Sequence, residues 1–363
     1  PPLPQRIQAR PSPPIEIVDM RRELGAGNRS IFSRTLLRSL LEMQAAGNQG
    51  ILFIHRRGHS SFVSCRSCGY VIECPRCDVS LSYHQIHDQA RPTLKCHYCG
   101  YTQAHPSHCP SCESPYLKRF GSGTQRVVSE LAKQHPELRC IRFDSDTTRT
   151  KGSHRTLLSR FAQGEADLLV GTQMLTKGID LPQVTLVGVM AADGLLYMSD
   201  YWSAERTYQT ITQVAGRAGR GEQPGRVIVQ TYTPEQPTIE AIRQQDYVAF
   251  AMTELDQRKA LGYPPYGRLV LLRLSSLNPI VVEQTAEKVA IALEECLSGL
   301  KKGSDYEILG PAPAPILRVA QRYRWQILLK MSLGADLPDI TSLRQHCPDR
   351  VSFAIDVDVL NLF

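Results

Sequence analysis

The sequence predicts an α/β protein in three parts: a parallel-sheet lobe, an inserted cysteine-rich module, and a smaller α/β domain at the C-terminal end. Three observations support this prediction. Apolar strand-like runs alternate with helix-like segments at βαβ intervals. Eight of the eleven cysteines lie within one window, at about residues 64–116. A turn-rich break, Gly262–Gly267, then separates the last part of the chain.

The first half of the lobe contains two strands and one helix by these criteria. Residues 15–20, Ile-Glu-Ile-Val-Asp-Met, are interpreted as a strand. From Ser30 to Met43, apolar residues recur at helical spacing, and Gly47 ends the segment. Gly50–His55 is almost entirely apolar, as expected of a strand buried on both faces of a parallel sheet.

The same alternation resumes after the cysteine window. Helices are expected at 124–132, 154–162 and 203–215, with strands at 138–143, 167–171, 184–190 and 225–230. A long helix is expected at 239–261, before the turn-rich break. The final domain is expected to contain strands at 269–274, 325–330 and 351–357, with helices at 281–297 and 337–346.

These elements divide the chain into five regions. They are a Pro-rich linker at 1–14, the lobe at 15–63 and 117–238, the inserted module at 64–116, a helical connector at 239–262 and the C-terminal domain at 263–363.

Charge and hydropathy limit the classes of partner. The formal net charge is +7, which permits a polyanionic partner, but two Zn²⁺ on eight thiolates would lower it to about +3. No run of eighteen apolar residues exists, so no membrane association is expected. The Pro-rich start has no signal-peptide pattern, and we therefore expect a cytoplasmic, reducing location, where paired cysteines are more often metal ligands than disulfides.

The cysteines form four Cys-x-x-Cys pairs, which suffice for two tetrahedral four-thiolate sites. Eighteen residues separate Cys77 from Cys96, which fits two knuckles around a hairpin. This favours a nested pairing, although crossed or sequential pairings also satisfy the spacing. The two predicted sites are Cys65, Cys68, Cys109 and Cys112, and Cys74, Cys77, Cys96 and Cys99.

Zinc is favoured over an iron–sulfur cluster at this spacing, and a closed four-thiolate site is structural and not catalytic. The neighbouring histidines are interpreted as surface groups or as partners of the ligands: His84, His87, His97, His105 and His108. Three cysteines outside the window are interpreted as small buried hydrophobic residues: Cys140, Cys296 and Cys347.

A second motif ends a predicted helix, at Gln213–Gly221. Arg217 and Arg220 are three residues apart, so both can face one polyanion, and guanidinium groups suit a nucleotide γ-phosphate. The small residues between them let another surface approach closely. A solvated basic helix end is the alternative, but it would not require Gln213 or the small residues.

A third motif, Gly171–Pro182, follows a predicted buried strand, and loops at that end of parallel strands build ligand sites. Alone it would be interpreted as an ordinary βα loop, but its position before the arginine motif favours a nucleotide-linked role. The residues with predicted roles are Thr172, Gln173 and Lys177 as donors to phosphates, Gly178 for backbone freedom, and Asp180 to orient an arginine or a ribose hydroxyl.

These two motifs resemble motifs V and VI of superfamily 2 helicases, and Ile51–Gly58 resembles the strand of motif IV. Together with the cysteine module, the chain from about Ile15 resembles the PriA (primosomal protein N′) family of replication-restart helicases. The segments that carry this narrower resemblance are 56–58, 73–77, 121–124, 144–148, 171–174, 193–194, 203–206, 213–220, 308–315, 322–330 and 356–358.

The resemblance implies a RecA-like second helicase lobe of an ATP-dependent 3′→5′ DNA helicase that uses ATP and Mg²⁺. Arg217 and Arg220 would reach the ATP γ-phosphate, with Arg220 as the arginine finger, and the motif V residues would couple nucleotide state to DNA contacts. Implied partners are branched and single-stranded DNA, primosome proteins, single-strand-binding protein and the replicative helicase loader. A fork-binding domain would begin near Tyr263.

The sequence departs from the family pattern in one major respect. It contains no Gly-x-x-x-x-Gly-Lys-[Ser/Thr] and no Asp-Glu-x-His, and Gly121–Thr124 lacks the P-loop lysine. We therefore expect the C-terminal half of a helicase, as a fragment or a truncated gene product, that cannot hydrolyse ATP alone. Ile179–Leu181 stands where the family often has His or Phe, so the role of Asp180 is open.

DNA contacts are predicted in the C-terminal domain. Arg318 and Arg322 are candidates for phosphate contacts beside Tyr323 and Trp325, whose rings could stack on bases, although Trp325 could equally be buried. Two other functions fit parts of the pattern. One is a non-enzymatic zinc-containing DNA- or protein-binding adaptor. The other is a component of a transcription or RNA-processing assembly, which the paired arginines argue against.

Overall fold

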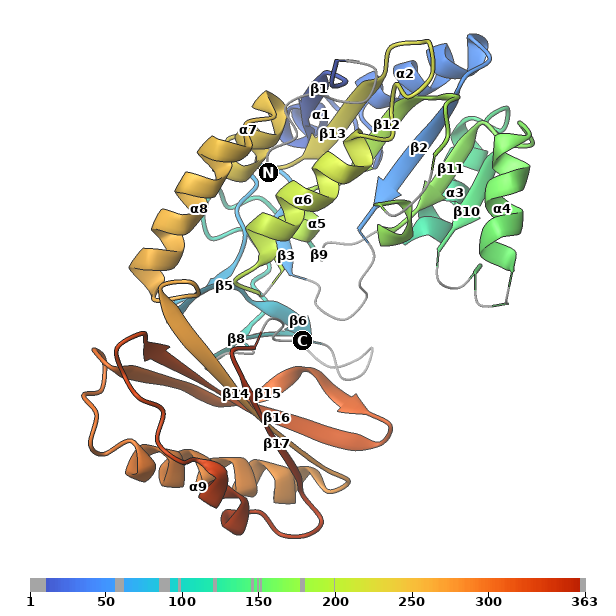
Figure 1. Cartoon of the computed structure of the whole chain (residues 1–363). Coiled ribbons are helices and arrows are strands. Elements are labelled where there is room, and N and C mark those ends of the chain that lie inside the picture. Colours follow the sequence, from blue (N-terminus) through green and yellow to red (C-terminus); the bar gives the residue numbers. More distant parts are fainter. Residues whose placement is uncertain are drawn as a thin grey trace.

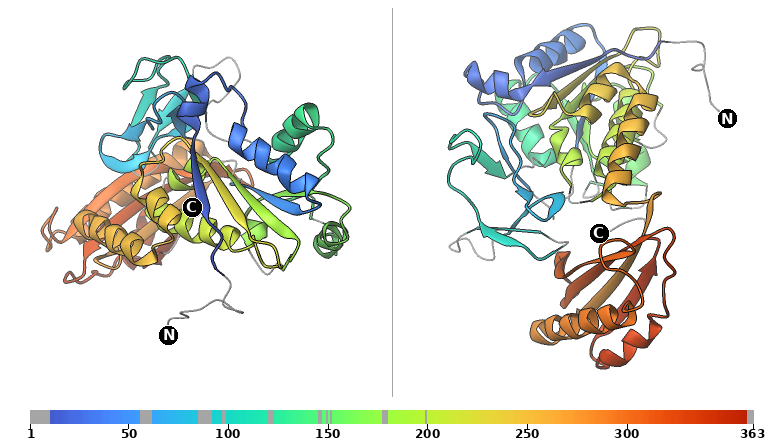
Figure 2. Two further views of the ribbon diagram at one scale, coloured as in Figure 1. Left: turned by 90° about the horizontal axis from the view of Figure 1, so that it is seen from above. Right: turned by 90° about the vertical axis from the view of Figure 1, so that its left-hand side faces the viewer.

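The computed structural model describes residues 11–55, 62–84, 92–96, 99–119, 123–144, 147–148, 150, 152–176, 180–198 and 200–359, without the side chains of 77–79 and 118–119. The lobe, the cysteine module and the C-terminal domain follow one another in space, with the module beside the junction of the other two (Figures 1 and 2).

The lobe is built on one six-stranded sheet whose neighbouring strands are all parallel. In spatial order the strands are β1 (Ile15–Asp19), β13 (Arg226–Thr231), β12 (Val184–Met190), β2 (Gln49–Ile54), β11 (Leu168–Gly171) and β10 (Cys140–Phe143). The short helices α1 (Met20–Gly25) and α5 (Asp193–Leu196) and the 3-10 helix η2 (Gln173–Thr176) follow strands β1, β12 and β11.

Helices cover both faces of this sheet, because successive residues of the buried strands point to opposite sides. Leu52 and Ile54 pack against α2 (Arg34–Ala45) and α3 (Thr124–Gln134) on one face. Ile51 and Phe53 belong to the core on the other face. The elements on that second face are α4 (Ser153–Ala162), α6 (Ser203–Ala215), α7 (Pro237–Gln244) and the start of α8 (Tyr247–Leu261).

The prediction of a single long helix at 239–261 is wrong, since α7 and α8 are separate helices. Gln245 adopts a left-handed conformation with φ of 58°, and the Asp246 side chain caps α8 by accepting from Ala249 N at 2.9 Å. Ile239 and Phe250 are buried in the lobe core, so the proposed connector packs as part of the lobe.

The cysteine module consists of short antiparallel strands. Strand β3 (Val63–Cys65) pairs with β9 (Leu117–Arg119) where the chain enters and leaves the module. A hairpin of β4 (Glu73–Cys74) and β5 (Cys77–Ser80) follows, and then a three-stranded sheet of β6 (Ser82–His84), β7 (Thr93–Lys95) and β8 (Thr102–Ala104).

The C-terminal domain has a four-stranded antiparallel sheet, in the order β15 (Tyr306–Val319), β16 (Arg322–Ser332), β14 (Gly267–Ser276) and β17 (Ser352–Val357). Helix α9 (Pro279–Cys296) covers one face. On the other face, Leu269, Leu271 and Leu328 share a buried cluster with Val63, Leu81 and Leu94 of the module. The module and this domain are therefore joined by a common core.

Two features of this domain differ from the sequence prediction. Strand β15 was not expected, and the helix expected at 337–346 is only a 3-10 segment, η3 (Thr341–His346). The domain is entered from α8, whose C-terminal cap is Gly262. Across the described part of the chain, no helix has both the length and the apolar content needed to cross a membrane.

Candidate metal centres and phosphate-binding site

Four cysteines from the two ends of the module converge on one point. The sulfur atoms of Cys65, Cys68, Cys109 and Cys112 all lie within 4.8 Å of one another. The Sγ–Sγ distance is 3.6 Å for Cys65 and Cys112, and 3.7 Å for Cys68 and Cys109. The first and last Cys-x-x-Cys pairs of the sequence are thus brought together by the β3–β9 stem.

A second group is formed by cysteines that lie, in the sequence, between the two pairs of the first group. The sulfurs of Cys74, Cys96 and Cys99 lie within 4.8 Å of one another, and the Cys74 and Cys99 sulfurs are 3.6 Å apart. The backbone of Cys77 pairs with Cys74, but its side chain lies outside the described atoms. The two groups follow the nested order favoured by the spacing, as far as the described residues extend.

The same backbone turn recurs at three of the knuckles. A backbone N–H four residues after the first cysteine donates to its carbonyl: Gly69 to Cys65 at 2.9 Å, Gly100 to Cys96 at 3.1 Å, and Glu113 to Cys109 at 2.9 Å. These three donor residues have φ between 57° and 81°. A left-handed residue after the second cysteine therefore closes each of these turns around the sulfurs.

The sulfur geometry fits a tetrahedral zinc ion. A Zn–S bond of about 2.3 Å places the sulfurs of a tetrahedron roughly 3.8 Å apart, close to the distances between the cysteine sulfurs here. Burial, together with the adjacent thiols, raises the pKa of Cys68 to about 12, and burial and the neighbouring cysteines likewise raise the pKa of Cys74 to about 12. A bound cation would stabilise the thiolate forms of Cys68 and Cys74 and so offset these raised pKa values, which suits a metal that displaces their protons.

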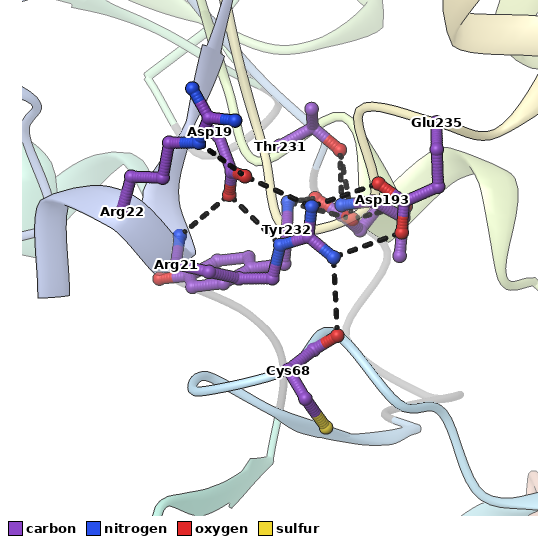
Figure 3. Close-up of polar contacts among 9 residues, drawn as sticks. Asp19, Arg21, Arg22, Cys68, Asp193, Thr231, Tyr232 and Glu235 are labelled. Atoms are coloured by element: carbon purple, nitrogen blue, oxygen red, sulfur yellow. Dashed lines mark hydrogen bonds and ion pairs between the residues drawn. The ribbon is translucent and has the colours of Figure 1, made fainter. Parts of the chain in front are cut away.

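The first knuckle is clamped to the lobe by side chains from β1, α1 and the turn after β13 (Figure 3). Arg21 donates to the carbonyl oxygen of Cys68 at 3.2 Å, and its guanidinium is also paired with Asp19 at 2.9 Å and Glu235 at 2.8 Å. From the module, Arg66 donates to the Tyr232 hydroxyl at 3.0 Å. The first cysteine group is therefore tied to the edge of the lobe sheet.

A buried carboxylate lies beneath this contact. Asp193 accepts hydrogen bonds from the hydroxyls of Thr231 and Thr233, both at 2.9 Å, and from Tyr232 N at 3.0 Å (Figure 3). Burial raises the pKa of Asp193 above its ordinary value, despite these hydrogen bonds. The carboxylate fixes the turn after β13, on which Tyr232 meets the knuckle.

The two arginines of the motif at 213–221 follow α6 and meet the segment after β11. Arg217 donates from Nη2 to the carbonyl oxygen of Thr176. Arg220 donates to the Gly216 carbonyl at 3.0 Å and to the Asp180 carboxylate at 3.1 Å. The structure thus brings both arginines to the loop in which the phosphate donors were predicted. Gln213 is exposed on the last turn of α6.

Small residues allow this close approach. Gly219 N donates to the Val184 carbonyl at 3.0 Å, which fixes the end of the arginine motif to the start of β12. A Cβ atom on Gly221 would collide with the carbonyl oxygen of Pro182. Larger side chains at these positions would therefore push the arginine motif away from the loop.

The two arginines have different surroundings, although both are half-buried. Burial, and secondarily the nearby charge of Arg220, lowers the pKa of Arg217, although a guanidinium stays protonated at neutral pH. The side chain of Arg220 is 37% exposed, and that of its partner Asp180 is 75% exposed. Since exposed ion pairs are weak, an incoming polyanion can replace the Asp180 carboxylate on Arg220.

The remaining predicted donors have different placements. Thr172 is buried directly after β11, and Gln173 begins η2. Lys177 and Gly178 lie outside the described residues, so their predicted roles stay predictions. In the C-terminal domain, Arg322 donates to the Ser275 hydroxyl at 3.0 Å.

Sequence reasoning missed the clamp formed by Asp19, Arg21, Arg66 and Tyr232. The only signal in the sequence is the presence of arginines in or just after elements that border the cysteine module. Arginines in such positions are common on surface helices and loops, so they do not indicate a contact.

Comparisons with known proteins agree with this arrangement. A model of the primosomal protein N C-terminal domain matches residues 259–360, a helicase conserved C-terminal domain matches 119–222, and the PriA DNA helicase Cys-rich region matches 74–103. These three matches fall on the C-terminal domain, the lobe and the module.

Relatives in two bacteria match nearly the whole chain. Replication restart protein PriA of Synechocystis sp. is 59% identical over 99% of this chain and 43% of that protein. The Bacillus subtilis protein of the same name is 48% identical over 90% of this chain and 40% of that protein. The chain thus spans less than half the length of these relatives.

Among solved structures, the match to a leucine-to-valine variant of Saccharomyces cerevisiae Dbp5 bound to RNA and ADP BeF3 covers 70% of this chain and 47% of the Dbp5 chain. The TM-score is 0.35 and the identity 11%. A likeness at this level adds nothing to the fold described above.

Proposed function

The chain belongs to the PriA family of replication restart proteins, and we propose that it forms the second motor lobe, the zinc module and the fork-binding domain of an ATP-dependent 3′→5′ DNA helicase. In this proposal a P-loop lobe, which this sequence does not contain, binds the ATP phosphates and Mg²⁺. The present chain supplies the arginines that complete the ATP site from the side opposite to the P-loop lobe.

The contact between the arginine motif and the preceding loop carries this proposal. Arg217 and Arg220 reach that loop from the end of α6, and Arg220 is held by an exposed carboxylate that a phosphate can replace. Arg220 is therefore the proposed arginine finger, with Arg217 and Gln213 beside it. Thr172, Gln173, Lys177, Gly178 and Asp180 are proposed to link nucleotide state to DNA contacts.

The two cysteine groups are proposed to hold two structural zinc ions. Bound zinc would fold the module and keep it on the lobe through the Cys68 carbonyl, and it would take no part in hydrolysis. Further proposed partners, which follow from family membership, are branched and single-stranded DNA, single-strand-binding protein, primosome proteins and the replicative helicase loader. The proposed location is the cytoplasm.

The test is complementation between two separately purified parts. This chain is mixed with a P-loop lobe from a PriA relative, and ATP hydrolysis is measured with and without fork DNA. We expect hydrolysis only in the mixture, and a loss of about 10³-fold in kcat for Arg220→Ala. Arg38→Ala, which removes an exposed arginine of α2, is the matched control and should leave the rate unchanged.

The alternative function is a non-enzymatic, zinc-containing DNA-binding adaptor. Tight fork binding by this chain, without hydrolysis in any mixture, would favour the adaptor. Hydrolysis that is insensitive to Arg220→Ala would contradict the arginine finger while leaving the helicase assignment in place.

A further inference from the structure

A cavity of about 480 Å³ lies between the second cysteine group and the C-terminal sheet. One wall comes from the module, with Lys95 at the end of β7 and with Cys96, Cys99 and Gly100. The other wall comes from β15, β16 and α9. The residues used below are Lys95, Glu283, Pro311, Pro313, Tyr323 and Trp325.

The two walls are fixed relative to one another by packing. Leu94, next to Lys95 on β7, is fully buried in one cluster with Leu271 and Leu328 of the C-terminal sheet. At the base of the cavity, a Cβ atom on Gly100 would lie 3.6 Å from the Pro311 carbonyl oxygen, so the two backbones already approach each other closely. The cavity is therefore a feature of the packed interface, and its opening needs no movement of the domains.

The chemistry of the walls suits a planar, unsaturated ligand. Tyr323 and Trp325 are both half-buried on β16, and Pro311 and Pro313 add flat apolar faces from β15. The guanidinium of Arg318 lies over the Tyr323 ring, 5.1 Å from its centre, which places a positive charge on one face of this ring. Aromatic rings beside cations are the usual means of binding a nucleobase together with its phosphate.

We propose that this cavity binds an unpaired nucleobase of single-stranded DNA, with Lys95 and Arg318 facing the adjoining phosphates. The proposal rests on the DNA-binding function proposed above and deepens it. It gives the unpaired strand of a fork a specific binding subsite on this chain. The binding is tolerant of sequence, because every base has a face that can stack.

A single-stranded nucleic acid fits the walls better than an acidic peptide tail does, because a base offers a flat face to Tyr323 and Trp325. The exposed carboxylate of Glu283, on α9, repels phosphates and peptide carboxylates alike, but it can accept a hydrogen bond from the amino group of a base. Lys95, on the opposite wall, meets a backbone phosphate. Since Cys96 and Cys99 also line the cavity, its shape depends on the fold of the second cysteine group.

The chain offers a direct reporter, because Trp202 and Trp325 are its only two tryptophans. In Trp202→Phe, all tryptophan emission comes from Trp325 in the cavity wall. We expect an oligothymidylate to quench this emission on titration. An abasic oligonucleotide of the same length and charge should bind at least about fivefold more weakly, since it lacks the stacking contribution of the base.

Two substitutions extend the test to the wild-type background, with fluorescence anisotropy of a labelled strand as the readout. Lys95→Ala and Tyr323→Leu should each weaken binding about fivefold or more. Lys301→Ala, an exposed lysine of the same domain away from the cavity, is the charge-matched control and should have no effect. Because anisotropy does not depend on Trp202→Phe, it remains decisive if that variant folds poorly.

Three results would overturn the proposal. They are equal quenching by the thymidine and abasic strands, unchanged binding in both cavity variants, and quenching by an acidic peptide but not by DNA. None of these results affects the complementation of ATP hydrolysis, so failure of this subsite can be told apart from failure of the helicase assignment.

Discussion

The guanidinium of Arg21 donates to the backbone carbonyl of Cys68 at 3.2 Å, and so connects the first helix of the lobe to a cysteine of the proposed metal site (Figure 3). The same guanidinium is paired with Asp19 and Glu235, which hold it in place from two directions. A conformational change at the edge of the lobe sheet can therefore reach the module through Arg21, as well as through the contact of Arg66 with Tyr232.

Arg21→Ala should loosen the module from the lobe. The substitution removes the hydrogen bond to Cys68. It also removes the Arg21 charge that pairs with the carboxylate of Asp19, whose side chain is only 14% exposed. We expect the free energy of unfolding to fall by about 1–2 kcal/mol. Chemical denaturation measures this change.

Arg22→Ala is the control for this experiment, because the Arg22 side chain is 91% exposed and makes only a 3.8 Å ion pair with Asp19. An equal loss of stability in both variants would mean that the contact with Cys68 has no special role.

Gly221→Ala should disturb the arginine motif without changing any charged group. Its added methyl group would collide with the Pro182 carbonyl oxygen, so the segment after α6 must shift away from the loop. We expect stability to fall by about 1–3 kcal/mol, as measured by thermal unfolding. Gly25→Ala, where a Cβ atom meets nothing within 4 Å, should not lower stability.

Much of the lobe could be predicted because its signals are local. Strands such as β2 are continuous apolar runs, and α6 ends in the small residues that bring Arg217 to the loop before β12. The helix break at Gln245 could not be predicted in this way. No glycine or proline marks it, and the left-handed residue is stabilised by the packing of α7 on the lobe.

The C-terminal domain was harder to predict because its longest strand contains prolines. Pro311, Pro313 and Pro315 argue against a central strand, but β15 lies at the edge of the sheet. Its register with β16 shifts between Leu309 and Ala312 and again between Pro313 and Arg318. These irregularities accommodate the prolines, and they also form one wall of the cavity, which no local pattern could indicate.

Removal of single ligands should separate the two proposed zinc sites. The cysteines fall into two groups, so Cys65→Ser should reduce the zinc content from two ions per chain to one. A colorimetric indicator after denaturation counts the ions. Cys140→Ser should retain two, because Cys140 lies on β10 outside both groups. Two ions in Cys65→Ser would contradict the grouping of the sulfurs.

Asp144 should make the stability of the lobe depend on pH in acid. Its fully buried side chain accepts from the Thr124 hydroxyl, from Arg142 at 2.8 Å and from Thr147 N at 3.1 Å. Burial alone would raise the pKa of this carboxyl, but the hydrogen bonds and the Arg142 charge lower it to about 2. A depressed pKa means that the ionised form stabilises the folded state above the unfolded pKa of about 3.9.

This stabilisation should therefore be complete above about pH 4 and be lost as the pH falls towards about 2. Asp144→Asn removes the charge at every pH, so we expect it to lower the unfolding free energy at pH 7 by at least about 1 kcal/mol and to flatten the acid dependence. Asp256→Asn, which changes an exposed carboxylate on α8, should leave the acid dependence unchanged. An acid profile of Asp144→Asn that is parallel to that of the wild type would show that another carboxylate governs this range.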